Sequence, residues 1–242
     1  MSIPKLIHYC WFGKKPLPNN CKKMIASWQK FLPDYQIMCW DETTFDVTVC
    51  AYVQSAYAAG KYAFVSDYAR LFALHKFGGV YLDTDIEAVR SFDSLLQGHS
   101  AVFGFESGEK AMTAFMAAQP EHPIIAEFLD YYTQLVFDPA NLEPNTVPLT
   151  EILERRGLVK NNTEQVIDGD VAVFPLDYFQ AYDFTKAVLC VTEKTCTVHR
   201  CYGSWCSPKE RMLFAVKRLL GKCLSEEAYG KLKRIKKKFM GD

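Results

Sequence analysis

Residues 78–85 read G-G-V-Y-L-D-T-D, a short apolar run between two glycines and a pair of aspartates. The run from Val80 to Leu82 predicts a buried strand of a parallel sheet, because it is continuously apolar and a turn signal precedes it. Asp83 and Asp85 then follow at the carboxyl end of that strand, the edge where open α/β sheets bind ligands. The stretch therefore predicts an α/β fold with its site beside these two carboxylates.

The spacing of Asp83 and Asp85 indicates a metal ion. Two carboxylates held this close repel each other unless a cation is shared between them. Mg²⁺ or Mn²⁺ suits hard oxygen ligands and can bridge them to a phosphate. The alternative is an aspartate-rich turn at the end of a strand. The first interpretation predicts a site for a metal and a diphosphate.

The preceding segment, residues 62–77, is apolar almost all round and ends at Gly78, which predicts a buried helix. Asp67 and Arg70 lie three residues apart and hence on one face of this helix. Because a buried charge needs a partner, two interpretations stay open. The two side chains pair with each other, or both face a polar ligand over the sheet edge, Asp67 accepting from hydroxyls and Arg70 donating to oxygens.

Residues 66–71 (S-D-Y-A-R-L) followed by residues 78–85 closely resemble the signature of the family 32 glycosyltransferases. These are sugar transferases with an Asp-x-Asp motif, related to the yeast initiating α-1,6-mannosyltransferase and more distantly to glucosylating bacterial toxins. Residues 3–13 resemble the first strand of that family, residues 40–42 the end of its second, and residues 198–205 its C-terminal His and Ser-Trp element. The resemblance implies a GT-A-like single domain with a mostly parallel, doubly wound sheet.

The resemblance also implies roles for individual residues. Those that bind the nucleotide sugar are Trp11, Asp67, Arg70, Tyr81, Asp83, Ser204 and Trp205. Those that hold the metal, Mn²⁺ or Mg²⁺, are Asp83, Asp85 and His199. The catalytic set is Asp67, Arg70, Asp83 and Asp85.

Several of these residues have an ordinary structural alternative. Trp11 is expected to stack on the donor base, which is worth about 1 to 3 kcal/mol, or else to pack in the core. Tyr81 either leans on the nucleotide or packs in the core. His199 either contacts the metal or diphosphate or is a structural histidine. Trp205 either closes over the phosphate with Ser204 or anchors the C-terminal segment.

The implied chemistry is transfer of a sugar. A divalent cation on the diphosphate stabilises the leaving group while an acceptor hydroxyl attacks the anomeric carbon. The resemblance implies retention of configuration, yet the sequence identifies no carboxylate nucleophile of the kind that a double displacement needs. Glu106, after the apolar run 101–105, is the weak candidate for an acceptor contact, with a solvated glutamate as the alternative. We therefore expect same-face substitution in which the leaving phosphate takes the acceptor proton.

The remaining elements follow from apolar periodicity and turn signals. The expected strands are 3–9, 36–40, 80–82, 101–105, 165–174 and 188–198. The expected helices are 20–31, 62–77, 121–137 and 148–156. The proline- and asparagine-rich loop 139–148 shapes the acceptor site if the resemblance holds.

Composition fits one domain, residues 1–206, with an extension, residues 207–242. The chain has 242 residues, 49% of them hydrophobic, and zero formal net charge. It lacks an apolar run of the roughly 18 residues that a membrane span needs, and its N-terminus is not of the secretory type, so we expect a cytoplasmic protein. The odd count of nine cysteines favours reduced thiols, and the four cysteines nearest His199 lack the paired spacing of zinc sites.

The extension is strongly basic. Residues 207–242 carry eleven Lys and Arg against four Asp and Glu, a net charge of +7. From Ser225, a helix start signal, apolar residues recur at helical spacing among lysines and arginines, which predicts a basic amphipathic helix that binds an anionic membrane surface. The alternative is a helix whose apolar stripe docks on the body of the protein. The first interpretation places the protein peripherally on the inner face of the cell membrane.

Together these patterns predict a bacterial-type, membrane-associated glycosyltransferase of capsule or O-antigen polysaccharide synthesis. It would move a hexose or HexNAc from a nucleotide sugar to a glycan or polyprenyl-linked glycan. UDP is favoured by analogy with the toxins, and GDP remains open.

A Mg²⁺-dependent phosphotransferase or phosphatase is one alternative, although in that class the D-x-D motif follows the first strand and has Thr or Val at the position that Glu87 occupies here. A noncatalytic sugar-binding protein is another. Nucleic acid is not an expected partner, because the basic residues gather in one terminal helix without interleaved aromatics.

Overall fold

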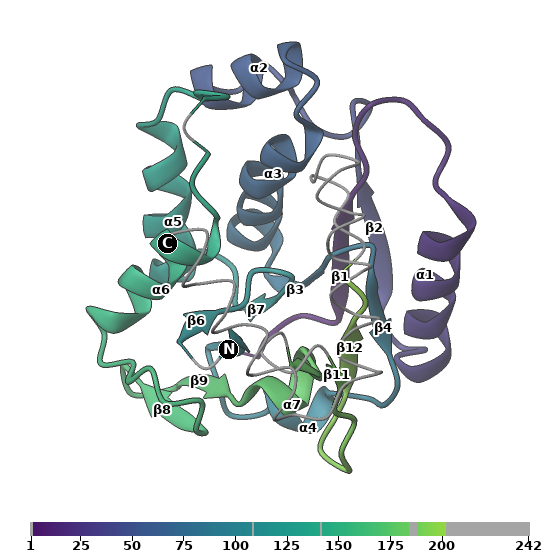
Figure 1. Ribbon diagram of the computed structural model, residues 1–242, viewed down its shortest axis with the longest axis vertical. Coiled ribbons are helices and arrows are strands. Elements are labelled where there is room, and N and C mark those ends of the chain that lie inside the picture. Colours follow the sequence, from purple (N-terminus) through teal and green to yellow (C-terminus); the bar gives the residue numbers. More distant parts are fainter. Residues whose placement is uncertain (1, 108, 141, 184–187, 202–242) are drawn as a thin grey trace, which may run out of the picture.

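The computed structural model describes residues 2–107, 109–140, 142–183 and 188–201 of the chain. A central sheet runs through the molecule (Figure 1). Its strands lie in the order β2 (Gln36–Trp40), β1 (Leu6–Cys10), β3 (Gly79–Leu82), β7 (Phe115–Ala118), β5 (Ala101–Ser107), β9 (Val171–Phe174) and β8 (Gln165–Ile167), with β6 (Lys110–Ala111) paired to β5.

Most strands of this sheet run in one direction. β1 is parallel to β2 and to β3, and β5 is parallel to β9. Only β7, between β3 and β5, and the edge strand β8 run the other way on this path. The predicted mostly parallel α/β sheet is therefore confirmed, whereas the reversed strand β7 was not predicted.

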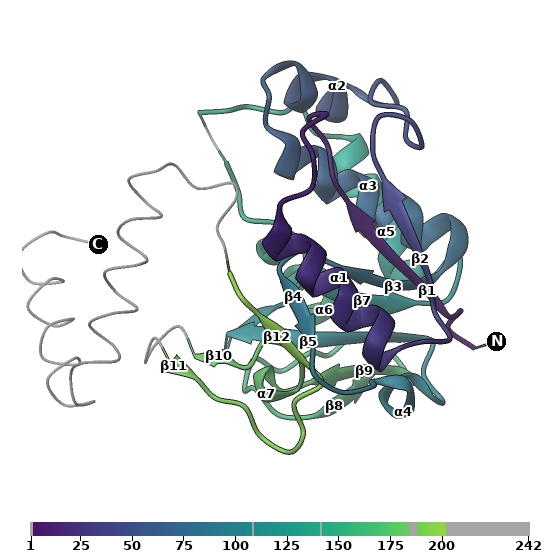
Figure 2. The ribbon, with the colours of Figure 1, turned by 90° about the vertical axis from the view of Figure 1, so that its right-hand side faces the viewer.

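Helices cover both faces of the sheet. α1 (Asn19–Phe31) lies on one face, and Figure 2 shows it in front of the strands with α3 (Tyr62–Phe77) and α5 (Pro123–Thr133) behind them. α2 (Ala51–Ala58) and α6 (Thr146–Glu154) pack on the same side as α3 and α5. Consecutive strand residues point to opposite faces. Accordingly Val80 packs into the cluster around Trp28 of α1, and Tyr81 into the cluster around Leu71 of α3.

The smaller elements complete the fold. Two short helices are α4 (Asp93–Leu96) and α7 (Leu176–Phe179), and two short ribbons are β4 (Ile86–Ala88) with β12 (Thr197–His199) and β10 (Tyr182–Asp183) with β11 (Val188–Leu189). In the antiparallel pair of β4 and β12, His199 is opposite Ile86, one residue after Asp85. This pairing brings the C-terminal part of the described chain to the Asp-x-Asp segment. None of the described helices has the length and apolarity that a membrane crossing requires.

The predicted boundaries hold best where one signal dominates. α3 has the predicted bounds, because Gly78 at φ +62° ends an apolar helix. The single predicted strand 165–174 is wrong: it is a hairpin of β8 and β9 that turns at Asp168 and Gly169, both with positive φ. The predicted strand 188–198 is likewise two short strands, β11 and β12. Apolar content alone did not reveal either turn.

Gly79 explains how β3 approaches β1. It has φ +100°, and a Cβ atom there would lie 2.7 Å from the carbonyl oxygen of Leu6. Gly157 has almost the same φ, +99°, but a Cβ atom there would meet nothing within 4 Å. The glycine at position 79 is therefore required for two reasons, backbone conformation and space.

The two glycines provide a matched test of this packing. Gly79→Ala and Gly157→Ala should each lose about 1–3 kcal/mol of unfolding free energy from backbone strain. Gly79→Ala should lose about 1–3 kcal/mol more, because the added methyl group crowds β1. Urea denaturation of both variants measures the difference. Equal losses would contradict the close approach of β3 to β1.

Candidate functional site

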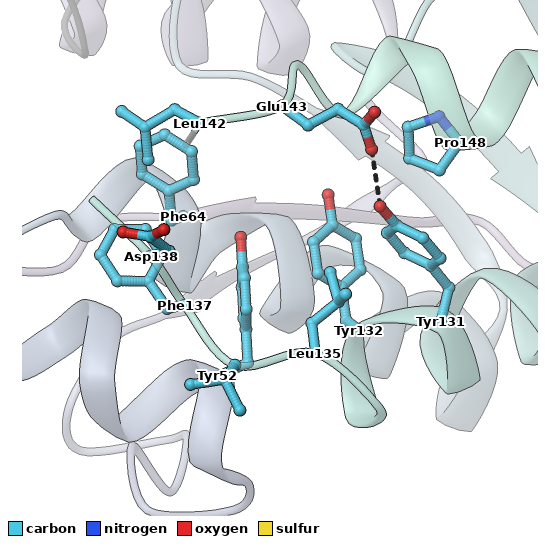
Figure 3. A pocket seen from close by; sticks show the side chains of 11 residues that line it. Tyr52, Phe64, Tyr131, Tyr132, Leu135, Phe137, Asp138, Leu142, Glu143 and Pro148 are labelled. Carbon is cyan, nitrogen blue, oxygen red and sulfur yellow. Dashed lines mark hydrogen bonds between the residues drawn. The ribbon is translucent and has the colours of Figure 1, made fainter. Parts of the chain in front are cut away.

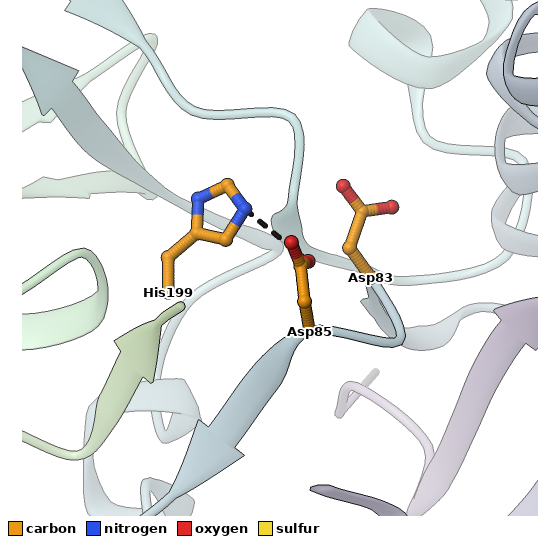
Figure 4. Close-up of side chains that lie close together, drawn as sticks. All are labelled: Asp83, Asp85 and His199. Atoms are coloured by element: carbon orange, nitrogen blue, oxygen red, sulfur yellow. Dashed lines mark ion pairs between the residues drawn. The ribbon is translucent and has the colours of Figure 1, made fainter. Parts of the chain in front are cut away.

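Asp83, Asp85 and His199 gather at one end of the sheet (Figure 4). Asp83 follows β3, Asp85 precedes β4, and His199 ends β12. One ligand atom from each residue can be chosen such that all three lie within 4.8 Å of one another. Two carboxylates and an imidazole form a donor set that fits a divalent cation such as Mn²⁺. The structure thus brings together the three residues that the sequence predicted as metal ligands.

Two buried side chains contact the carboxylate of Asp83. The Tyr81 hydroxyl donates to its Oδ1 over 2.8 Å, and an Arg70 amino group lies 3.4 Å from the same oxygen. Its backbone N–H donates to the carbonyl of Ala114. Both side-chain contacts fall on Oδ1, so Asp83 is oriented while Oδ2 has no such contact within the described structure.

Asp85 and His199 form an ion pair. The Nε2 atom of His199 lies 3.3 Å from Oδ1 of Asp85, and both side chains are largely buried. Burial lowers the pKa of His199, but the nearby Asp85 carboxylate and Cys201 raise it more, so the net pKa is well above the usual value. A metal ion and this proton would compete for the same Nε2 atom, which makes cation binding a proton-releasing step.

Gln180 orients His199. Its Oε1 atom lies 3.0 Å from Nδ1 of His199 and can only accept, so Nδ1 carries a proton and Nε2 faces Asp85. The Gln180 side chain is fully buried, and its amide nitrogen donates to the sulfur of Cys201. Such outer partners fix the ring and tautomer of a ligating histidine. The sequence signal that was missed is a glutamine within the otherwise apolar run 178–182.

Arg70 and Asp67 are buried, at 5% and 7% exposure, and pair with each other over 2.9 Å. The internal ion pair that the sequence left open is therefore present, and Arg70 extends it to Asp83. Arg70 also donates to the carbonyls of Thr113 and Ser66, and its guanidinium lies 4.6 Å from the Tyr81 ring centroid.

Asn145, which the sequence analysis missed, completes this network. Its amide nitrogen donates to Oδ1 of Asp67 over 2.6 Å, and its own carbonyl oxygen accepts from Thr113. Burial raises the pKa of Asp67 to about 6, with Arg70 and Asn145 acting in the opposite direction. A pKa of about 6 leaves this carboxylate mostly ionised at pH 7, and its ion pair with Arg70 favours the charged form. No periodicity marks Asn145, which lies in the proline-rich loop.

The other predicted residues have different surroundings. Trp11 follows β1, is half-buried, and donates its indole N–H to the carbonyl of Lys15. It is therefore not a core residue. Tyr81 is 1% exposed and packs in the core, which leaves its ring buried and its hydroxyl on Asp83. The structure thus shows the core-packing alternative for the ring, and the contact with a nucleotide stays a prediction. Ser204 and Trp205 lie outside the described residues.

Glu106, the candidate acceptor contact, is half-buried at the end of β5. Burial raises its pKa; the charges of His199 and Lys110 lower it, and Asp83 raises it further. Two of these charges, on His199 and Asp83, belong to the candidate metal site. It is thus neither the freely solvated glutamate of the alternative interpretation nor remote from the site.

Residues 18–102 match a family described as the glycosyltransferase sugar-binding region containing a DXD motif. This region includes Asp83 and Asp85 but not His199. Inositol phosphoceramide mannosyltransferase 3 of Schizosaccharomyces pombe is 31% identical over 99 residues, which cover 39% of this chain and 28% of that protein. Inositol phosphoceramide mannosyltransferase 1 of the same yeast is 29% identical over 137 residues, 51% of this chain and 41% of that protein. The chain therefore spans less than half the length of these relatives.

Solved structures agree on the fold. The PaToxG glycosyltransferase superposes with a TM-score of 0.51 at 22% identity, covering 64% of this chain and 69% of that one. A glycosyltransferase involved in the glycosylation of the major capsid of PBCV-1 gives a TM-score of 0.50 at 12% identity, covering 86% and 97%. These structures show that the fold is GT-A-like. The match of residues 18–102 to a DXD-containing region and the likeness to the yeast mannosyltransferases are what support a glycosyltransferase.

Removal of Arg70 tests its structural role. Arg70→Ala should lower the unfolding free energy by about 3–5 kcal/mol, because it leaves the buried carboxylate of Asp67 unpaired. Arg155→Ala is the matched control: its exposed pair with Glu127 should be worth less than about 1 kcal/mol. Chemical denaturation measures both. If the two variants lose the same small amount, Arg70 does not hold the network together.

Substitution of Gln180 tests its action through His199. Gln180→Leu should weaken Mn²⁺ binding about 10–100-fold, as loss of an outer partner does at other metal sites, whereas Gln180→Glu keeps an acceptor and should bind better than the leucine variant. Calorimetric titration with Mn²⁺ measures both, and thermal melts confirm folding. In a double-mutant cycle, Gln180→Leu should add little to His199→Ala. Fully additive losses would exclude action through His199.

Proposed function

We propose that the protein is a metal-dependent glycosyltransferase that moves a sugar from a nucleotide diphosphate sugar to an acceptor hydroxyl. The observation that carries this proposal is the cluster of Asp83, Asp85 and His199 at the carboxyl edge of a GT-A-like sheet. The match of residues 18–102 to a DXD-containing sugar-binding region supports it.

Each residue of the site has its own proposed role. Asp83, Asp85 and His199 would hold Mn²⁺ or Mg²⁺, which when bound supplies charge stabilisation to the departing diphosphate. Arg70 lies beside Asp83 and keeps its carboxylate in place. Trp11, half-exposed after β1, offers an indole face for the donor base. We propose that Asp67 and Asn145, which bond to each other on the α3 side of the site, position sugar hydroxyls.

For the donor we propose a hexose, attached to UDP or GDP. The names of the two yeast relatives specify mannosyl transfer to inositol phosphoceramide, so mannose joins the candidate sugars. We further propose retention through same-face substitution. Glu106 is half-buried at the end of β5, its pKa is lowered by the charge of His199, and it would face the acceptor.

For the acceptor we propose a glycan or a lipid-linked glycan of the cell surface. The lipid named in the yeast relatives supports an acceptor at a membrane. The basic segment 207–242, with its net charge of +7, lies outside the described residues. Several basic residues near an anionic leaflet contribute about 1 kcal/mol each, so this segment would hold the enzyme beside such an acceptor.

The two alternative functions are less well supported. In the aspartyl-phosphate type of phosphotransferase the aspartate pair follows the first strand of the chain. Here Asp83 follows β3, the third strand. A noncatalytic sugar-binding protein has no need to keep Asp83, Asp85 and His199 together with the buried Arg70 behind them.

Asp85→Asn tests the proposed function. It should abolish sugar transfer and Mn²⁺-dependent donor binding while keeping the fold, because the charge is lost and the shape is retained. Asp34→Asn is the control and should be fully active, because Asp34 lies on the exposed surface, where it pairs with Lys5. Thermal shifts with UDP- and GDP-hexoses, with and without Mn²⁺, identify the donor, and its hydrolysis then reports turnover. Full activity in excess chelator would refute the proposal.

A further inference from the structure

A pocket whose lining does not include Asp83, Asp85 or His199 lies between α2, α3, α5 and the loop that leads to α6 (Figure 3). Its volume is about 230 Å³. Pockets that enclose a drug-sized molecule measure roughly 300–1,000 Å³, so this one suits a single small ring. We call it the tyrosine pocket; its principal lining residues are Tyr52, Phe64, Tyr131, Tyr132, Phe137 and Glu143.

Two buried tyrosines of this pocket present unused hydroxyl groups. Tyr52 and Tyr132 are 6% and 3% exposed, with ring centroids 4.9 Å apart. Figure 3 shows both hydroxyl ends directed into the hollow, beside that of Tyr131, which donates to Glu143 over 2.7 Å. Within the described structure the hydroxyls of Tyr52 and Tyr132 have no hydrogen-bond partner. Their rings are buried, but neither hydroxyl oxygen is, because within the described structure only Nδ1 of His75 is a buried side-chain atom without a partner. Both hydroxyls can therefore bond to a polar ligand that enters the hollow.

The charge of the pocket restricts the ligand class. Asp138 and Glu143 stand at the rim, and no basic side chain is among the described residues that line the pocket. An anion such as a nucleotide diphosphate would be repelled, so the donor does not belong here. A cation would need the faces of the aromatic rings, whereas the hydroxyl tips point into the hollow. A neutral ring with several hydroxyl groups matches both the phenols and the carboxylates.

The pocket is linked to the candidate site by one short stretch of chain. Glu143 bonds to Tyr131 at the pocket, and Asn145, two residues on, bonds to Asp67. The charge of Asp67 also raises the pKa of Tyr52, although burial is the larger cause. A ring held in the tyrosine pocket would therefore lie beside the network that supports Asp83.

We propose that the tyrosine pocket binds a neutral hexopyranose ring of the acceptor. Tyr52 and Tyr132 donate to ring hydroxyls, and Glu143 accepts from another. This assignment of the ring to the acceptor rests on the proposed function, whereas binding of the ring does not.

The test uses the full chain and four defined probes, the methyl α-D-pyranosides of glucose, galactose, mannose and N-acetylglucosamine. Saturation-transfer NMR and titration should detect binding of at least one. Tyr52→Phe and Tyr132→Phe each remove one hydrogen bond and should weaken it about two- to tenfold. Glu143→Gln, at the exposed rim, provides a third variant that does not disturb the core. Tyr178→Phe, on α7, is the matched control, since the Tyr178 hydroxyl bonds to Glu164, away from the pocket, and this variant should bind normally.

Three outcomes would overturn the proposal: no binding of any of the four sugars, binding that is unchanged in both phenylalanine variants, or binding of choline that displaces the sugar. Donor hydrolysis without an acceptor is measured in the same preparations. Hydrolysis without sugar binding would refute the pocket and leave the transferase proposal intact. Sugar binding without hydrolysis of any donor would support the pocket and count against the transferase.

Discussion

The buried guanidinium of Arg70 is the interaction on which the rest of the site depends. Removing a guanidinium from water costs several kcal/mol unless charged and hydrogen-bonding partners replace the solvent. Here Asp67, Asp83, two backbone carbonyls and the face of Tyr81 supply those partners. These groups come from α3, from the end of β3 and from the segment before β7. The contacts of Arg70 therefore hold the helix, the sheet and Asp83 in fixed positions relative to one another.

To this network the fold adds a candidate metal ligand from far along the sequence. The sheet edge supplies two carboxylates, and the antiparallel pairing of β12 with β4 brings His199 against Asp85. Gln180, fully buried, then selects the tautomer that turns Nε2 toward the carboxylates. Preorganisation of this kind matters for group transfer, because a cation held in one geometry stabilises developing charge without rearrangement of the protein.

The same loop serves both sides of the proposed reaction. Asn145 bonds to Asp67 beneath the candidate donor site, and Glu143 bonds to Tyr131 at the tyrosine pocket. Transfer between two substrates requires that their reacting atoms meet in a fixed orientation, and much of the barrier can be removed by that positioning alone. A loop anchored to the donor network at one residue and to the pocket at another provides a direct mechanical link between the two. It also explains why a proline- and asparagine-rich segment is held by specific hydrogen bonds.

The sequence by itself determined the elements with strong local signals: α3 from its apolar run and terminal glycine, β3 from residues 80–82, and the placement of Asp83 and Asp85 at a sheet edge. It also determined that Asp67 and Arg70 share a helix face, because helical geometry fixes that spacing. Only the tertiary structure decided their pairing, the reversed strand β7, the hairpin at Asp168, and the contacts of Gln180 and Asn145. Those features depend on contacts between residues distant in the chain, and a local pattern carries no information about which distant groups will meet.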